Sequence, residues 1–294
     1  MTSHTANVVF WASIAVLPFS ETAIAQQPGE SLPNTPVYKV DVVSSTTKAI
    51  NYRHRSGATK ISFKGTALMP EAKGEAKVES KKGYIEIEVE FDNLSKAGVL
   101  GPENLTYVLW AITPEGRAKN LGELLVSGTS GKLNVTTEMQ VFGLVVTAEP
   151  YYAVTIPSDI VVLENVVRPD TQGKIEEVVA KYELLQRGHY SHNIRPELLS
   201  AFVPGGDVPL ELVEARNAIH IARGAGADKW AADTFNKAVS NLQQAEDYYS
   251  RKQKKPTIMI AREAVQTAED ARLIAVRRIQ EDQLAKERQS AAQR

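Results

Sequence analysis

The sequence contains no cysteine, and this absence removes several classes of function at once. Without a thiol there is no disulfide, no thiolate zinc site and no cysteine nucleophile. A lipoprotein anchor is also excluded, because lipid attachment would need a cysteine directly after the leader. The chain of 294 residues is nevertheless long enough to form roughly two domains with a real hydrophobic core.

Histidine is scarce, with five residues in the chain, and its spacing predicts no metal site. His189 and His192 are three residues apart, which on a helix would place two imidazoles on one side. The residues around them predict a loop, however, and no third ligand is fixed nearby. A metal-dependent hydrolase that uses this pair is therefore the least favoured of the functions considered.

Two further patterns imitate catalytic motifs. Ser45 and Lys48 have the Ser-x-x-Lys spacing, but they lie in a region that predicts a strand, and the partner motifs of penicillin-recognising enzymes are absent. Gly128 to Lys132 lacks the first glycine of a phosphate-binding loop and is followed by Leu133 where that loop needs Ser or Thr, so we predict a hairpin turn. We expect no enzymatic activity, no cofactor and no bound metal.

Long apolar runs are also missing, and the short one near the start predicts an export signal. Val8 to Phe19 is apolar and precedes Ala23-Ile24-Ala25, the small-x-small pattern that signal peptidase cuts before Gln26. A membrane-spanning helix would need about 20 apolar residues, so an uncleaved anchor is the alternative with less support. We expect residues 1–25 to be a signal peptide, residues 26–36 a flexible linker, and the protein to be exported to the periplasm or cell envelope, with no later transmembrane segment.

Residues 37–168 read as short strands separated by turns. The clearest alternation runs from Tyr84 to Phe91, where apolar residues alternate with Glu86, Glu88 and Glu90, so one face is expected to be buried and the other wet. Similar apolar runs occupy Lys60 to Met69, Leu105 to Ile112, Leu121 to Val126, Lys132 to Thr137, Val141 to Ala148 and Asp159 to Val167. We predict an antiparallel β-sandwich, the β part of an α+β, multidomain fold.

The second half of the chain has a helical period. Residues 169–207 are interpreted as a connector, although Val178 to Leu185 fits either a helix or a strand. Residues 208–280 predict an Ala-rich antiparallel helical hairpin or bundle, with Asp207 and Asp228 as N-caps and a break at Lys254-Lys255-Pro256. Residues 281–294 are almost wholly polar and predict a helical tail that projects or frays.

Aromatic residues supply the candidate contact site. Trp110 has apolar neighbours and predicts core packing. Tyr151 and Tyr152 follow Pro150 at a strand end and are better placed for exposure. They are the candidate residues for contact with a ligand or partner, with simple coverage of the loop as the alternative.

Two family resemblances accompany these patterns. The first rests on Tyr107-Val108-Leu109-Trp110, Pro114-Glu115-Gly116, Leu121-Gly122-Glu123-Leu124 and Phe142 to Pro150. These stretches resemble the extracytoplasmic domain of anti-sigma-K factors, a small β-sandwich. No sigma-binding cytoplasmic segment precedes them, so an anti-sigma function does not follow.

The second resemblance concerns the helical half. It rests on Glu214-Ala215-Arg216-Asn217-Ala218, Ala222-Arg223, Gly226-Ala227-Asp228-Lys229, Ala232 and Ala261-Arg262-Glu263-Ala264. These residues look like an uncharacterised helical domain that, in Gram-negative envelope proteins, leads through a long polar helix to an OmpA-type peptidoglycan-binding domain. The βαβ segment of an OmpA-type domain does not occur in these 294 residues, so direct wall binding by that route is not expected.

Charge and layout together set the expected partners. The sequence has 34 basic and 35 acidic residues and a formal net charge of −1, so nothing global attracts nucleic acid. The resemblances imply a partner that is an envelope protein or a cell-wall component, at the outer membrane or wall. We expect a non-enzymatic scaffold or spacer, and the alternative is a glycan- or peptide-binding module that uses the loops around Tyr151 and Tyr152; the oligomeric state stays open.

Overall fold

The computed structural model describes residues 42–52, 57–166, 178–185, 190, 194–201 and 206–293. Contacts divide the chain at Val37, and all the described strands and helices belong to the unit Tyr38–Arg294. The predicted export signal with Ala23, Ala25 and Gln26 lies outside the described residues, as does the pair His189 and His192.

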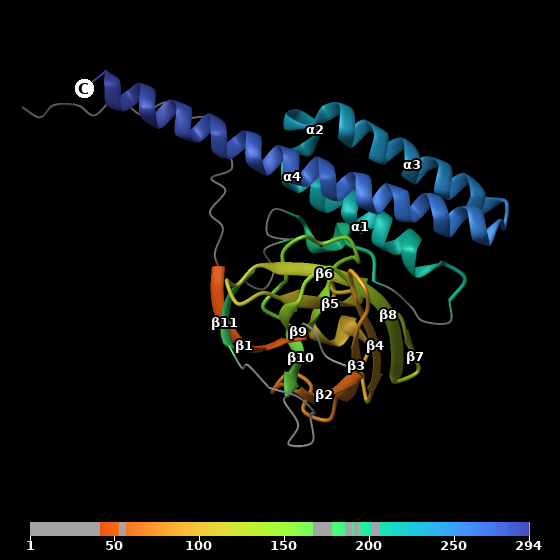
Figure 1. The fold of residues 1–294 in the computed structure, drawn as a ribbon. Coiled ribbons are helices and arrows are strands. Elements are labelled where there is room, and N and C mark those ends of the chain that lie inside the picture. The colour runs from red at the N-terminus through yellow and green to blue at the C-terminus, as the bar shows by residue number, and fades with distance from the viewer. Residues whose placement is uncertain are drawn as a thin grey trace, which may run out of the picture. The chain divides into compact units, whose positions relative to one another are not determined.

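Strands make up the first half of the described chain (Figure 1). They are β1 (Val42–Asn51), β2 (Ala58–Gly65), β3 (Lys73–Ser80), β4 (Ile85–Asp92), β5 (Thr106–Ile112), β6 (Ala118–Leu124), β7 (Val126–Ser127), β8 (Ser130–Thr137), β9 (Val141–Glu149), β10 (Val161–Val166) and β11 (Val178–Leu185). Short 3-10 turns lie at Ala97–Leu100 and Pro196–Leu198. The antiparallel β part and the helices that follow it confirm the predicted α+β class.

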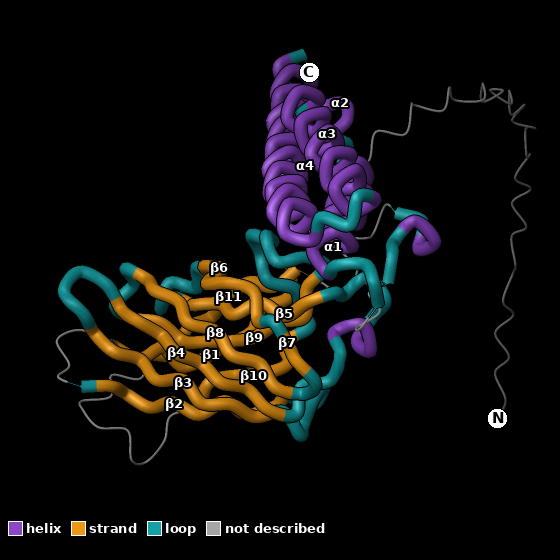
Figure 2. The backbone as a smooth tube through the Cα atoms, turned by 90° about the vertical axis from the view of Figure 1, so that its right-hand side faces the viewer, coloured by secondary structure: helices purple, strands orange, loops and turns teal. Residues whose placement is uncertain are grey.

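Antiparallel pairing connects these strands in a single sheet, where a sandwich would have two. The strand order is β11-β1-β9-β10-β2-β3-β4-β8-β7, and β9 also carries β5, which in turn pairs with β6. The sheet curls until β6 lies against β8, and Gly122 of β6 faces Leu133 and Val135 of β8. The result is an almost closed cylinder, whose strands are seen from the side in Figure 2.

Side-chain alternation explains which residues fill the cylinder. In β4 every second residue, from Ile85 to Phe91, is buried in the interior, as the sequence predicts. In β5 all residues are buried, because Tyr107 and Leu109 point into the interior while Val108 and Trp110 lie on the outer face under the helices. The interior cluster and the outer cluster are therefore two separate hydrophobic cores.

The helices lie against the outer core. They are α1 (Leu210–Gly224), α2 (Ala227–Trp230), α3 (Ala232–Ser250) and α4 (Lys254–Ala292), and α4 contacts each of the others. The buried stripe of α4 is made mostly of small residues, which let helix axes approach closely. Its members are Ala261, Ala264, Val265, Ala268, Ala271, Ala275 and Ile279.

Helix ends differ from the sequence prediction in detail. Asp207 does not cap α1, which follows Pro209 as its N-cap, and Asp228 lies inside the short α2. The break before α4 comes at residues 251–253, where Lys252 has a left-handed φ of 57°. Pro256 then stands in the first turn of α4, where its missing N–H leaves no hydrogen bond unmade.

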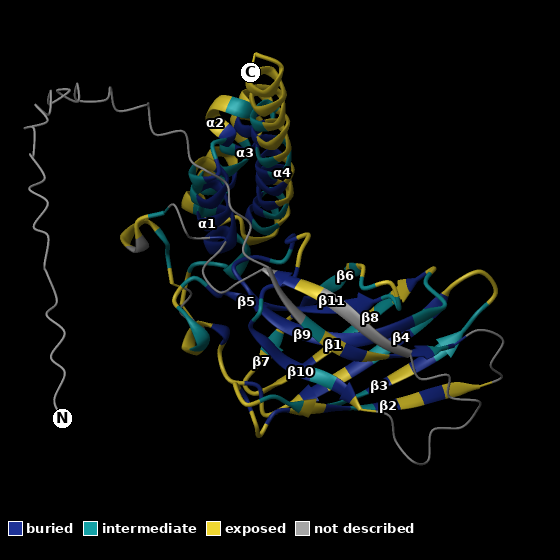
Figure 3. Cartoon of the chain, turned by 90° about the vertical axis from the view of Figure 1, so that its left-hand side faces the viewer, coloured by how far each residue is buried: buried dark blue, intermediate teal, exposed yellow. Residues whose placement is uncertain are grey.

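The last turns of α4 extend past the buried stripe. Figure 3 shows this C-terminal part as mostly exposed, and beyond Ile279 its residues are exposed or half-buried. Among the described helices, none is both long and apolar enough to cross a membrane.

Part of the predicted connector belongs to the sheet. The segment Val178–Leu185, which the sequence left open between helix and strand, is β11 and pairs antiparallel with β1 from Val42 to Ala49. Strand β3 was not singled out by the sequence, because its Lys73–Ser80 stretch is interrupted by charged residues and Gly74. Its buried Ala76 and Val78 nevertheless keep the strand period.

Candidate functional site

Both candidate contact residues lie in the loop between β9 and β10. Tyr151 is fully buried, and its hydroxyl donates a 2.6 Å hydrogen bond to Oε2 of Glu269 in α4. Tyr152 is half-buried, and its hydroxyl donates to the backbone carbonyl of Arg262, also in α4, at 2.7 Å. The expected exposure is therefore wrong for Tyr151, because α4 covers this loop. The pair joins the sheet to the helices of its own chain.

On the α4 side, Tyr151 contacts a buried ion pair formed by Arg272 and Glu269. Arg272 donates from Nε and Nη2 to the two carboxylate oxygens of Glu269, at 2.7 and 2.8 Å. The side chains of Arg272 and Glu269 are 5% and 0% exposed. Thr155, from the same loop as Tyr151, donates a 2.9 Å hydrogen bond to Oε1 of Glu269. Both carboxylate oxygens of Glu269 thus accept hydrogen bonds from the loop and from Arg272. We call this contact region between the helices and the sheet with its β9–β10 loop the joint.

Tyr190 closes the other side of this ion pair. The guanidinium carbon of Arg272 lies 4.8 Å from the centroid of the Tyr190 ring, and the Tyr190 hydroxyl donates to the carbonyl of Ile156 at 2.7 Å. Burial alone would lower the pKa of Arg272, but the charge and hydrogen bonds of Glu269, together with Tyr151 and Tyr190, outweigh burial and raise that pKa well above its ordinary value. Arg272 is therefore a permanent cation inside the joint.

A second cluster lies around Tyr152. The guanidinium carbon of Arg262 is 3.8 Å from the centroid of the Tyr152 ring, and its Nη1 donates at 2.7 Å to Oε2 of Glu123 in β6. Thr106 donates to the other oxygen of Glu123 at 2.8 Å. The backbone N–H of Tyr152 donates at 3.1 Å to Oε1 of Glu214 in α1. Strand, loop and two helices therefore meet at one polar cluster.

Glu214 is a fully buried acid in this cluster. Its pKa is raised well above the ordinary value, first by complete burial and then by the Glu123 carboxylate, while Arg262 opposes the rise. The Oε2 atom of Glu214 is buried and makes no hydrogen bond to any described residue.

Glu149 at the end of β9 is the second buried acid. Burial raises its pKa to about 8, although hydrogen bonds from Ser158 and Thr147 lower it. Oε1 of Glu149 accepts from the Ser158 N–H at 2.8 Å and from the Thr147 hydroxyl, which itself accepts from Nε1 of Trp110 at 2.8 Å. Its Oε2 is buried and has no hydrogen-bond partner within the described part of the chain.

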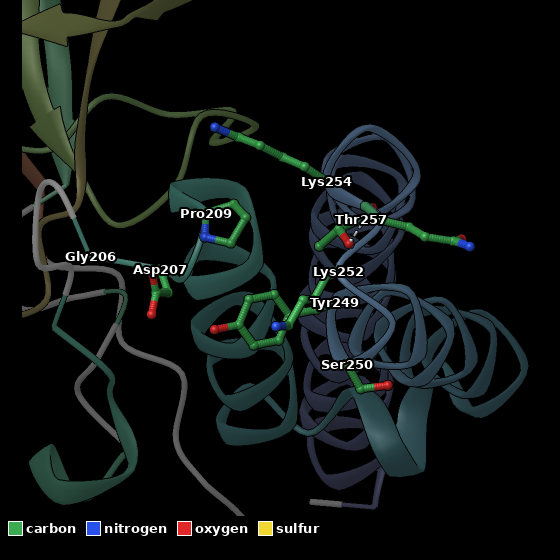
Figure 4. Close-up of a pocket in the computed structure, with 9 residues that line it drawn as sticks. Gly206, Asp207, Pro209, Tyr249, Ser250, Lys252, Lys254 and Thr257 are labelled. Atoms are coloured by element: carbon green, nitrogen blue, oxygen red, sulfur yellow. Dashed lines mark hydrogen bonds between the residues drawn. The ribbon is translucent and has the colours of Figure 1, made fainter.

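An open cavity of about 630 Å³ lies apart from this joint. It is formed by the start of α1, the end of α3 and the start of α4, and Figure 4 shows the Tyr249 ring pointing across the opening toward Asp207. The lining residues are Gly206, Asp207, Pro209, Tyr249, Ser250, Lys252, Gln253, Lys254 and Thr257. The sequence predicted the chain break at this place but gave no sign of a cavity.

The two sequence patterns that imitate catalytic motifs do not form catalytic sites in the structure. Ser45 and Lys48 lie in β1, an extended strand in which residues three apart point to opposite faces, so the lysine does not approach the serine. Gly128, with a φ of 66°, lies in the predicted turn between β7 and β8. Within the described ranges, no three His, Asp or Glu side chains are grouped to hold a metal ion.

Sequence reasoning missed the charged members of the joint. Arg272 follows the buried Val265 by seven residues and Ala268 by four, so it falls on the buried stripe of α4 rather than on its wet face. Glu214 stands between the buried Val213 and Ala215. A charged residue at a core position was the available signal, and it predicts a buried partner.

Comparison of the chain with protein-family models, with curated proteins and with solved structures gives no match.

Proposed function

We propose that this chain is a non-enzymatic, exported scaffold or spacer of the cell envelope, associated with the outer membrane or cell wall. The observation that carries the proposal is the form of α4. This helix has 39 residues, and at 1.5 Å per residue it is about 58 Å long. Its first two-thirds is anchored by the buried stripe, while its last turns are exposed and charged.

The exposed end of α4 is suited to contact a partner rather than to complete the fold. Lys286 and Arg288 lie there among the acidic residues Glu281, Asp282 and Glu287, and the Lys286–Asp282 ion pair is a local i,i+4 contact. A polar helix gains little from packing on its own chain, so we expect this surface to bind a second molecule. We also propose that the curled sheet serves as a sandwich-like module and that α3 with α4 serves as an antiparallel hairpin.

Capture of partners tests the proposal directly. The tagged full chain is expressed in a Gram-negative host, the cells are fractionated, and the solubilised envelope is passed over the protein, with purified peptidoglycan sacculi sedimented in parallel. We expect envelope localisation and a specific protein partner. The double variant Lys286→Glu/Arg288→Glu should lose that partner, while a matched charge reversal on the sheet, Lys77→Glu/Lys132→Glu, should keep it. Cytosolic localisation, or equal capture by the tail variant, would refute the proposal.

A ligand-binding module is the second candidate, and the cavity at the start of α4 favours it. The expected route through Tyr151 has little support, since that ring is buried against α4. The cavity instead offers Tyr249, Lys252 and Lys254 to an accessible ligand such as a glycan or peptide. A panel of glycans and wall peptides that leaves the melting temperature unchanged would argue against this function.

A further inference from the structure

The joint between the helices and the sheet lies at the outer of two hydrophobic cores, which share no residue. The interior core is enclosed by the curled sheet, and the outer core unites the helices with the outer face of β5 and β9. No strand pairing involves the helices, so the joint is the candidate place for the helices to separate from the sheet.

Each polar cluster at the joint has one acid more than its arginine can neutralise. In the first cluster, Arg272 binds both oxygens of Glu269, which leaves no cation for the neighbouring Glu149. In the second, Arg262 is bound to Glu123, which leaves Glu214 without a cation of its own. Both extra acids are fully buried, and each keeps one oxygen without a hydrogen bond to the described residues.

Charged or titratable groups from several elements lie close to these two acids. Glu214 of α1 faces Glu123 of β6, Arg262 of α4, Tyr152 of the loop and, on its own helix, Glu211. Glu149 of β9 faces Glu269 of α4 and Tyr190, and Arg272 lies beyond them on the Glu269 carboxylate. Ionisation of either acid would leave a buried negative charge with no cation hydrogen-bonded to it and without a full set of donors among the described residues.

We propose that Glu149 and Glu214 form an acid latch: α1 and α4 are held on the sheet while both carboxyl groups are protonated, and their hold weakens as the pH rises. The latch would control access to the outer face of β5 and β9, where Val108, Trp110 and Val145 are covered in the closed state. Its chemistry does not depend on the proposed envelope function.

The direction of the pH effect follows from proton linkage. In the released state, water restores an ordinary glutamate pKa near 4.5, whereas burial in the closed state raises that of Glu149 to about 8. Between these two values the released state binds fewer protons than the closed state. The equilibrium constant for release therefore rises by roughly tenfold per pH unit for each group and levels off above the closed-state pKa.

The absence of cysteine allows a direct measurement of release. Cysteines are introduced at Val99 beside the sheet and Met259 on α4, which are 68% and 65% exposed, and both are spin-labelled. The urea midpoint for the change in label distance is followed from pH 5.5 to pH 8.5, while the far-UV circular dichroism of the sheet is recorded in the same samples. We expect the wild-type midpoint for release to fall with rising pH before the sheet signal is lost.

Variants that imitate the protonated acids should remove the effect. Glu149→Gln and Glu214→Gln should each reduce the pH shift of the midpoint, and the double variant should abolish it, while the exposed Glu138→Gln should behave as the wild type. An unchanged shift in the double variant, or no shift in the wild type, overturns the latch. Should the variants fail to fold, carbon NMR titration of the wild-type carboxyl groups decides: ordinary pKa values for both acids would also overturn it.

Discussion

The Tyr151 hydroxyl lies 2.6 Å from Oε2 of Glu269, although 118 residues separate the two in the sequence. This bond links the loop after β9 to the middle of α4, and both side chains are fully buried. Since Arg272 and Thr155 also donate to Glu269, the carboxylate is the centre at which the loop and the helix are fixed to each other. Removal of this carboxylate, or of one of its donors, should therefore change the free energy of unfolding of the whole unit.

Tyr151→Phe should therefore lower the free energy of unfolding while leaving the ring packing intact. The lost hydrogen bond goes to a charged acceptor, for which about 1.5–3 kcal/mol is typical. Urea denaturation at pH 7 measures the change, and Tyr84→Phe, at a ring that is 42% exposed, is the control and should change little. Equal stability of the Tyr151 variant and the wild type would mean that this bond contributes nothing net.

Arg272→Met should be more harmful, because it leaves the Glu269 carboxylate buried without its cation. Breaking a buried pair in this way costs about 3–5 kcal/mol. The double variant Arg272→Met/Glu269→Gln removes the uncompensated charge and should recover part of the loss. At the exposed Arg251–Asp247 pair, with atoms 4.0 Å apart, Arg251→Met should cost at most about 1 kcal/mol. A double variant less stable than Arg272→Met would contradict this account.

Inside the cylinder, Gly74 of β3 should not tolerate a side chain. A Cβ there would lie 2.3 Å from Cδ1 of Phe91 and 2.8 Å from the Glu90 carbonyl oxygen. The Phe91 ring has little freedom to move, since it packs edge-on against Phe63 with ring centroids 4.8 Å apart. Gly74→Ala should cost about 1–3 kcal/mol in the free energy of unfolding.

The matched control for this substitution is Gly98→Ala. A Cβ at Gly98 would meet nothing closer than the Asn104 carbonyl oxygen at 3.7 Å, which is an ordinary contact. Thermal unfolding of the two variants side by side should lower the melting temperature for Gly74→Ala only. A similar decrease in both would show that loss of glycine, rather than the Phe91 contact, determines the result.

Local patterns predicted the elements better than their arrangement. The alternation from Ile85 to Phe91 identified β4 and its buried face, because each residue's exposure follows from its own position in the strand. The order in which β9 takes three neighbours, β1, β5 and β10, depends on pairings between distant segments and leaves no local mark. The continuous apolar run of β5 showed burial on both faces, but it did not say that helices cover the outer one.

The candidate site was found in part and misread. Tyr151 and Tyr152 were predicted to be exposed for contact with a ligand or partner, but a strand-end position after Pro150 does not reveal that α4 lies over it. The two latch acids were passed over because a glutamate near a strand end or in a helix usually faces water. Their burial depends on tertiary contacts that the single sequence does not carry.

The exposed end of α4 should contribute almost nothing to stability, in contrast to the turn just before it. Deleting residues 281–294 removes mostly exposed residues, so the free energy of unfolding should change by less than about 0.5 kcal/mol. Ile279, which is 1% exposed and packs near Gly226, is the matched core position, and Ile279→Ala should cost about 2–5 kcal/mol. Urea denaturation of both variants measures the difference. A strongly destabilised deletion variant would show that the tail packs on its own chain, and the argument that it is available to a partner would then be lost.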